Sequence, residues 1–172
     1  MPVDPTIGSV GGIDRAAWPF WRSVVNRVQN VSSANIRTAM AKLFYATQRG
    51  TDKVDLVIMD DIFYGYLDDA LETNQRFART GGKMAKAGFE SIVYKGGAEV
   101  VMASGQGGAC PPETAFFINT NHLKWRPHVD RNMVFMDTGK PIDQDAVIKW
   151  LRFAGNMCSD NLSLQGRLIQ GA

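Results

Sequence analysis

Residues 32–49 carry the most regular hydrophobic pattern in the chain. Apolar side chains recur there every three or four positions, which is the spacing of one face of an amphipathic helix. Ser32 or Ser33 can cap the start of this helix with a side-chain oxygen. Gly50 follows Arg49 at the position where a left-handed residue commonly ends a helix. The pattern therefore predicts a helix over residues 32–49 that packs one face against a core.

A buried strand and a second helix are predicted directly after it. Residues 54–59 (VDLVIM) form a short apolar run, as expected for a buried strand. Asp60 or Asp61 can then cap a helix that extends to about residue 77. A helix, a strand and a helix in close succession predict a layered α/β unit with the strand in the middle.

Further short strands are predicted between residues 89 and 126. Residues 89–94 and 98–102 are rich in β-forming residues, and Lys95-Gly96-Gly97 between them is a hairpin signal. Residues 114–118 and 123–126 are two more runs that favour strands.

The C-terminal part of the chain is predicted to form a long β-hairpin. Residues 146–153 (AVIKWLRF) carry apolar side chains on both strand faces, with Trp150 on one of them. Ser159-Asp160-Asn161 supplies turn-forming side chains, and residues 162–169 run back, with Gly166 as a bulge or a point of close approach. A strand that is apolar on both faces requires a covering surface.

The first 29 residues are predicted to be a linker or lead-in segment. Residues 1–12 are rich in Pro and Gly and carry little apolar pattern. Trp18, Phe20 and Trp21 then cluster around Pro19, which favours an extended or turn conformation. These aromatic side chains either pack as a plug against the domain or anchor a contact between subunits, where aromatic residues are enriched.

The composition excludes several classes of protein. Hydrophobic residues make up 45% of the chain and charged residues 21%, which fits a globular domain and excludes a disordered or fibrous chain. A net charge of +2 without a Lys/Arg cluster gives no electrostatic footprint for nucleic acid. The two cysteines form no C-x-x-C pair, which favours a reducing compartment. We expect neither a membrane span nor a signal peptide, because no suitable apolar run is present.

Asp60 and Asp61 are the first residues that could carry chemistry. They follow a buried strand at its C-terminal end, where open α/β sheets bind ligands and magnesium. Acidic residues are favoured at the same place simply because a helix begins there. Capping is the interpretation we adopt, and the alternative is a metal- or nucleotide-binding α/β enzyme that uses both carboxylates.

Two other groups of residues give weaker chemical signals. Gly105-Gln106-Gly107-Gly108 lies in a loop predicted over residues 104–112, and it lacks the frame and the following helix of a phosphate-binding loop. Cys110 with His122 or His128 has no local signature of an activated thiol nucleophile. The sequence therefore predicts a structural or binding protein and not an enzyme, with no cofactor and no metal.

Short motifs in a fixed order along nearly the whole chain carry a family resemblance. They are GGIDR at 11–15 before WPFWR at 18–22, SSANI at 32–36, DLVIMDD at 55–61, FINT at 117–120 with Leu123 and RPH at 126–128, PIDQDA at 141–146, GNM at 155–157 and LQG at 164–166. Their combination, order and spacing resemble the major capsid proteins of tailed bacteriophages, the family with the Hong Kong ninety-seven fold.

The resemblance implies an α+β fold, with an A-domain whose mixed sheet is flanked by helices and with long P-domain strands. On that map residues 1–29 are the lead-in segment, residues 30–136 the A-domain-like core and residues 137–172 the P-domain-like hairpin. No N-arm, E-loop or spine helix precedes Gly11, so we expect a C-terminal fragment of such a protein. Its hairpin would then be partly bare, or covered by another copy.

The resemblance also implies a function. The chain would be a structural subunit that assembles with other copies, as pentamers and hexamers, into an icosahedral capsid enclosing double-stranded DNA without specific contacts. Scaffold and portal proteins are further expected partners, and the virion is the expected location after assembly in the host cytoplasm. The expected inter-subunit contacts are Trp18, Phe20, Trp21, Gln106 and Trp150. An encapsulin-like nanocompartment shell, which shares the fold, is the alternative.

Overall fold

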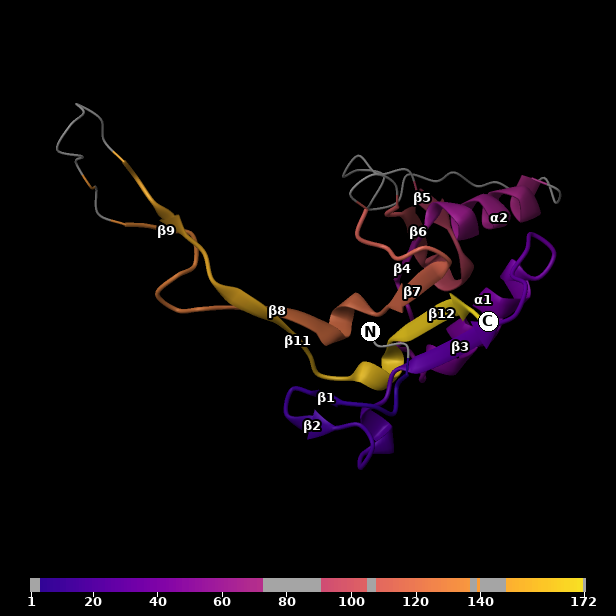
Figure 1. Ribbon diagram of the computed structural model, residues 1–172, viewed down its shortest axis with the longest axis horizontal. Coiled ribbons are helices and arrows are strands. Elements are labelled where there is room, and N and C mark those ends of the chain that lie inside the picture. The colour runs from indigo at the N-terminus through magenta and orange to yellow at the C-terminus, as the bar shows by residue number, and fades with distance from the viewer. Residues whose placement is uncertain (1–3, 73–90, 105–107, 137–138, 140–147, 172) are drawn as a thin grey trace. The chain divides into compact units, whose positions relative to one another are not determined.

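The computed structural model describes residues 4–72, 91–104, 108–136, 139 and 148–171 (Figure 1). The chain forms two compact units. The first unit comprises Met1–His122 and Asn161–Ala172, and the second unit comprises Leu123–Asp160. The domain boundaries predicted after residues 29 and 136 differ from the limits of these two units. The assignment of residues to an A-domain and a P-domain stays a prediction.

The first unit is built on a mixed six-stranded sheet with the strand order β3-β12-β7-β4-β6-β5. β12 is parallel to β3 and β4 is parallel to β6, while the other neighbours are antiparallel. The strands are β3 (Val24–Val28), β4 (Leu56–Met59), β5 (Ser91–Val93), β6 (Glu99–Met102), β7 (Thr114–Ile118) and β12 (Gly166–Gln170). The predicted α+β class with a mixed sheet is confirmed.

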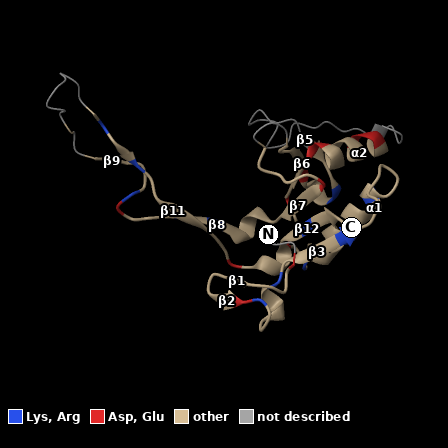
Figure 2. Cartoon of the chain, in the orientation of Figure 1, with Lys and Arg blue, Asp and Glu red and all other residues tan. Residues whose placement is uncertain are grey.

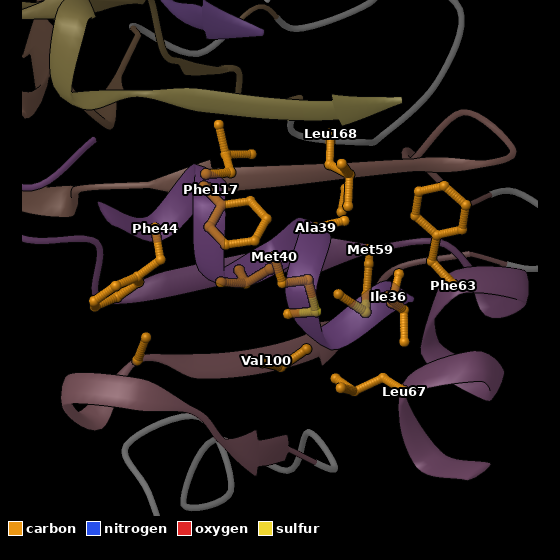
Figure 3. Packing of buried hydrophobic residues seen from close by; sticks show 14 of the residues in the cluster. Ile36, Ala39, Met40, Phe44, Met59, Phe63, Leu67, Val100, Phe117 and Leu168 are labelled. Atoms are coloured by element: carbon orange, nitrogen blue, oxygen red, sulfur yellow. The ribbon is translucent and has the colours of Figure 1, made fainter. Parts of the chain in front are cut away.

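Helices α1 (Ile36–Thr47) and α2 (Asp61–Glu72) cover one face of this sheet. Met40 of α1, Phe63 of α2 and Phe117 of β7 have no exposed surface and belong to one cluster (Figure 3). The strand register places Val57 beside both Val100 and Phe117, so these buried side chains lie on the same sheet face. The core of the first unit therefore lies between the two helices and this face.

Helix α1 lies inside the predicted range but begins later than expected. Asn35 occupies its N-cap position, and no side chain accepts a capping hydrogen bond there. The predicted cap by Ser32 or Ser33 is wrong, because the Ser32 carbonyl accepts from the amides of Asn35 and Ile36 and so forms a turn before the helix. Gly50 has the expected left-handed backbone (φ 60°), although it lies beyond Gln48, the C-cap residue.

Helix α2 and the following hairpin agree with the sequence patterns. The Asp60 carboxylate accepts a hydrogen bond from the Phe63 amide (3.1 Å), which confirms the predicted cap. The predicted end of this helix, near residue 77, lies outside the described residues. β5 and β6 pair as an antiparallel hairpin through the 3-10 turn Lys95–Gly97, where Gly96 and Gly97 have positive φ angles. The predicted strands at 114–118 and 123–126 are present as β7 and β8.

The N-terminal segment is more than the predicted linker. Strands β1 (Ser9–Val10) and β2 (Ile13–Asp14) form a small hairpin, followed by the 3-10 turn Pro19–Trp21. Residues Val24–Val28 form β3 and pair with β12 at the edge of the large sheet. The linker prediction fails there because the sequence around β3 gives little hydrophobic signal for a strand. Its pairing partner, β12, lies at the other end of the chain.

The predicted C-terminal hairpin is wrong. β11 (Gly155–Ser159) pairs with β8 (Leu123–Pro127), and the two-residue strands β10 (Leu151–Arg152) and β9 (Val134–Phe135) pair with each other. After the 3-10 turn Leu162–Leu164, β12 enters the large sheet between β3 and β7. A run of buried residues from Ser163 to Ile169 suits a central strand with partners on both sides, which a hairpin cannot provide. Residues 140–147 of the predicted long strand lie outside the described residues.

Candidate functional site

The second unit exposes an unusual amount of apolar surface. None of its described residues is buried. Isolated two-stranded ribbons are at best marginally stable in water, because they have no third layer to cover them. The exposed large apolar side chains of this unit are Trp125, Val129, Met133, Val134, Phe135, Met136, Ile148, Trp150, Leu151, Phe153 and Met157. Such a concentration marks an interaction surface.

The β8–β11 ribbon has one apolar and one polar face. Antiparallel register places Leu123, Trp125 and Met157 on the same face, and the Trp125 ring stacks on Phe153 with the centroids 5.5 Å apart. We call these four residues the Trp125 face. The opposite face carries Lys124, Arg126, Asn156 and Cys158. This amphipathic ribbon therefore offers one side for docking and one for solvent.

Gly155 allows the Trp125 ring to lie across the ribbon. A Cβ at position 155 would lie 2.5 Å from Cζ2 of Trp125, which is closer than real contacts permit. A side chain at this position would therefore displace the ring from Phe153. Gly155 thus preserves the shape of the Trp125 face.

The Trp125 face is not among the contacts predicted from the sequence. The alternation of Leu123, Lys124, Trp125 and Arg126 is the signal that could have revealed it. The matching alternation in β11 is weak, because Gly155 and Ser159 occupy the apolar side.

The predicted contact residues of the first unit have different environments. Trp18 and Phe20 are 55% and 60% exposed and form an edge-to-face pair with centroids 5.8 Å apart. Trp21 is half-buried, and its indole Nε1 donates to the Val10 carbonyl (3.0 Å). Trp18 and Phe20 are thus accessible to a partner, whereas Trp21 holds the N-terminal hairpin to the 3-10 turn.

Trp150 and Gln106 complete the predicted contact set. Trp150 is 63% exposed, and its carbonyl accepts from the amide of Met136 beside the β9–β10 pair. Gln106 lies outside the described residues, as does most of the glycine run at 105–108. The role of either residue in a subunit contact stays a prediction.

Asp60 and Asp61 are both engaged within the first unit. The buried Asp60 carboxylate accepts from the amides of Phe63 (3.1 Å) and Glu113 (2.5 Å), and so ties the loop before β7 to the start of α2. Burial raises the pKa of Asp60, although these two hydrogen bonds act in the opposite direction. The exposed Asp61 accepts from the Ser104 hydroxyl (2.9 Å). The arrangement is that of capping groups that also fix a loop.

The Cys110 thiol and the His122 imidazole contact different groups. The Sγ atom of Cys110 donates to the Thr114 carbonyl (3.4 Å). Burial, and then the charge of Asp60, raises the pKa of this thiol to about 11, so it is not a nucleophile near neutral pH. His122 Nε2 lies 3.7 Å from an Asp52 carboxylate oxygen. Within the described residues, no three or more His, Cys, Asp and Glu side chains gather as a metal site would require.

Comparisons with known proteins add no assignment. No protein-family model matches the chain, and no curated protein matches its sequence. In the part of the chain that the structure describes, neither helix has the length and hydropathy needed to cross a bilayer.

Proposed function

We propose that this chain is a structural subunit of a tailed-phage or prophage capsid, which assembles with other copies into a closed shell around double-stranded DNA. The second unit carries the proposal: its apolar surface has no cover within itself, and it therefore needs a partner surface. The collinear motifs that resemble phage major capsid proteins support the same function. The mixed α+β sheet of the first unit is compatible with it.

A shell subunit works through repeated contacts instead of a reaction. Each specific contact buries on the order of 1,000 Å² or more. Contacts that are individually weak become strong together, because the first raises the effective concentration for the next. Exposed aromatic side chains such as Trp18, Phe20 and Trp150 are suited to these contacts. The partners are other copies in pentamers and hexamers, with scaffold and portal proteins at special positions, and the site of action is the virion.

Electron microscopy tests this function most directly. The gene product that contains this chain is expressed and purified, and its particles are imaged and sized by sedimentation velocity. Closed shells of uniform size are expected. A protein that stays monomeric at high concentration, with and without co-expressed neighbouring genes, would overturn the proposal. Shells filled with a protein cargo instead of DNA would assign a nanocompartment.

A further inference from the structure

A hollow of about 460 Å³ lies in the second unit, beside the turn after β8. The backbone holds this turn in place: the His128 amide donates to the Ala154 carbonyl (2.9 Å), and the Ala154 amide donates to the Arg131 carbonyl (2.8 Å). The Arg131 amide closes the turn onto the His128 carbonyl (3.2 Å). These backbone hydrogen bonds fix the turn after β8 to the segment at Ala154, and so fix the backbone beside the hollow.

The hollow combines cationic and apolar side chains. Its lining is His128, Asp130, Arg131, Val134, Phe135, Met136 and Arg152. The structure shows no hydrogen bond or ion pair of the Arg131 or Arg152 guanidinium with any described residue. Basic positions flank β9 in Figure 2. We call this feature the arginine hollow.

The composition of the arginine hollow favours a protein partner over nucleic acid. Surfaces that bind nucleic acid are strongly cationic and polar. Here the lining includes two guanidinium groups and one carboxylate, that of Asp130, together with Phe135, which is 69% exposed. Arginine next to exposed aromatic and aliphatic side chains is typical of the centre of a protein–protein contact. The matching partner carries a carboxylate between apolar side chains.

The first unit presents such a surface at the start of α2. Asp61 is exposed, and the Ser104 hydroxyl engages one of its carboxylate oxygens. Ile62 directly follows Asp61 and is 40% exposed, and Met102, two residues before Ser104, is 48% exposed. Figure 2 shows acidic positions along α2. We call Asp61, Ile62 and Met102 the Asp61 patch, which complements the arginine hollow in both charge and apolarity.

We propose that the arginine hollow of one copy receives the Asp61 patch of a second copy. The contact pairs the Asp61 carboxylate with Arg131 and Arg152, and places Ile62 and Met102 against Phe135 and its neighbours. Because the two surfaces differ, the contact is head-to-tail, and a repeated contact of this kind closes a ring when the rotation between copies closes. This inference rests on the proposed function, and it names the pair of surfaces that joins neighbouring subunits.

A charge-swap experiment in the gene product that contains this chain tests the contact. Arg131→Glu should weaken self-association at least about tenfold, because it places two carboxylates together. Lys149→Glu is the matched control, since it makes the same change in net charge at an exposed position of the second unit outside the hollow. Asp61→Arg alone should also weaken association. The combination of Arg131→Glu with Asp61→Arg should restore it to within about threefold of the wild type.

Sedimentation velocity over a range of protein concentrations gives the readout, with the melting temperature of each variant confirming that it folds. Rescue in the combined variant, with little effect of Lys149→Glu, supports the contact. Equal association of the wild type and Arg131→Glu overturns this inference while leaving the shell function intact. Association that does not weaken with added salt also overturns it. So does a compact form of the protein whose amount does not depend on protein concentration. A wild type that never associates overturns both proposals.

Discussion

At the scale of single residues, the first unit uses its buried polar groups to join segments. Asp60 connects the start of α2 to the loop before β7 through two amide donors. The Gln165 side chain accepts a hydrogen bond from the Asn119 amide and donates one to the Asn119 carbonyl, both 3.0 Å long. These two bonds join the start of β12 to the end of β7. Most buried polar groups in folded proteins are paired in this way, because an unpaired one costs free energy.

Asp60 predicts a pH dependence of stability. Because burial raises its pKa in the folded protein above 3.8, the contribution of Asp60 to stability is complete below pH 3.8 and is lost as the pH rises through the folded pKa. Asp60→Asn removes this titration. In urea unfolding, the stability of the wild type relative to Asp60→Asn should therefore fall as the pH rises from 3.8. A constant difference would mean that the two amide donors cancel the effect of burial on the pKa, and a rising difference would mean that they outweigh it.

Asp61→Asn is the matched control for this measurement. It makes the same change of carboxylate to amide at the next position in the chain, where the side chain is exposed instead of buried.

The two cysteines should react at very different rates in the folded, unassembled protein. Cys158 is exposed, whereas Cys110 is buried and has a pKa of about 11. At pH 8 only about one thousandth of such a thiol is thiolate, the reactive form. A chromogenic thiol reagent should therefore modify one thiol quickly, and the second only after unfolding. The fast phase should vanish in Cys158→Ser, and two equally fast thiols in the native protein would contradict this prediction.

At the scale of elements, the close packing of α1 on β12 depends on Gly166. A Cβ there would lie 3.0 Å from Leu43 Cδ1 and from Thr47 Cγ2, both on α1. The strand thus meets the helix without a side chain between them. This confirms the close approach expected at Gly166 from the sequence, although the strand lies in the large sheet and not in a hairpin.

Alanine at two glycines should have opposite effects on stability. Gly166→Ala should destabilise the fold by about 1–3 kcal/mol, because the added methyl group overpacks the contact between α1 and β12. Gly65 is exposed in α2, and an added Cβ would meet no other atom within 4 Å, so Gly65→Ala should stabilise by about 0.5–1 kcal/mol. Urea unfolding of both variants measures the two values. Equal effects at the two positions would contradict the packing described for β12.

At the scale of the whole molecule, the two units differ in how they are stabilised. The first unit has a core in which Met40, Phe63 and Phe117 are fully enclosed, whereas no described residue of the second unit is buried. A unit without a core gains its stability from what it contacts. The proposed assembly should therefore protect the second unit more than the first.

The Trp125 face should matter for association and not for folding of the first unit. Trp125→Ser combined with Met157→Ser removes the largest side chains of that face. Self-association should weaken at least about tenfold, as for the central residues of an interface, while the urea unfolding midpoint of the first unit stays unchanged. Asn156→Ser, on the opposite face of the same ribbon, is the matched control. Loss of the main unfolding transition would instead place the Trp125 face in the core.

The sequence by itself determined the elements whose signals are local. The apolar spacing in 36–47, the Asp60 cap of α2 and the glycines of the β5–β6 turn depend on residues a few positions apart. Only the tertiary structure decided which strands pair, because partners such as β3 and β12 are separated by most of the chain. It also decided that the apolar side chains of residues 148–153 stay exposed while β12 is buried, since a hydrophobic run indicates that a cover is needed but not which surface provides it.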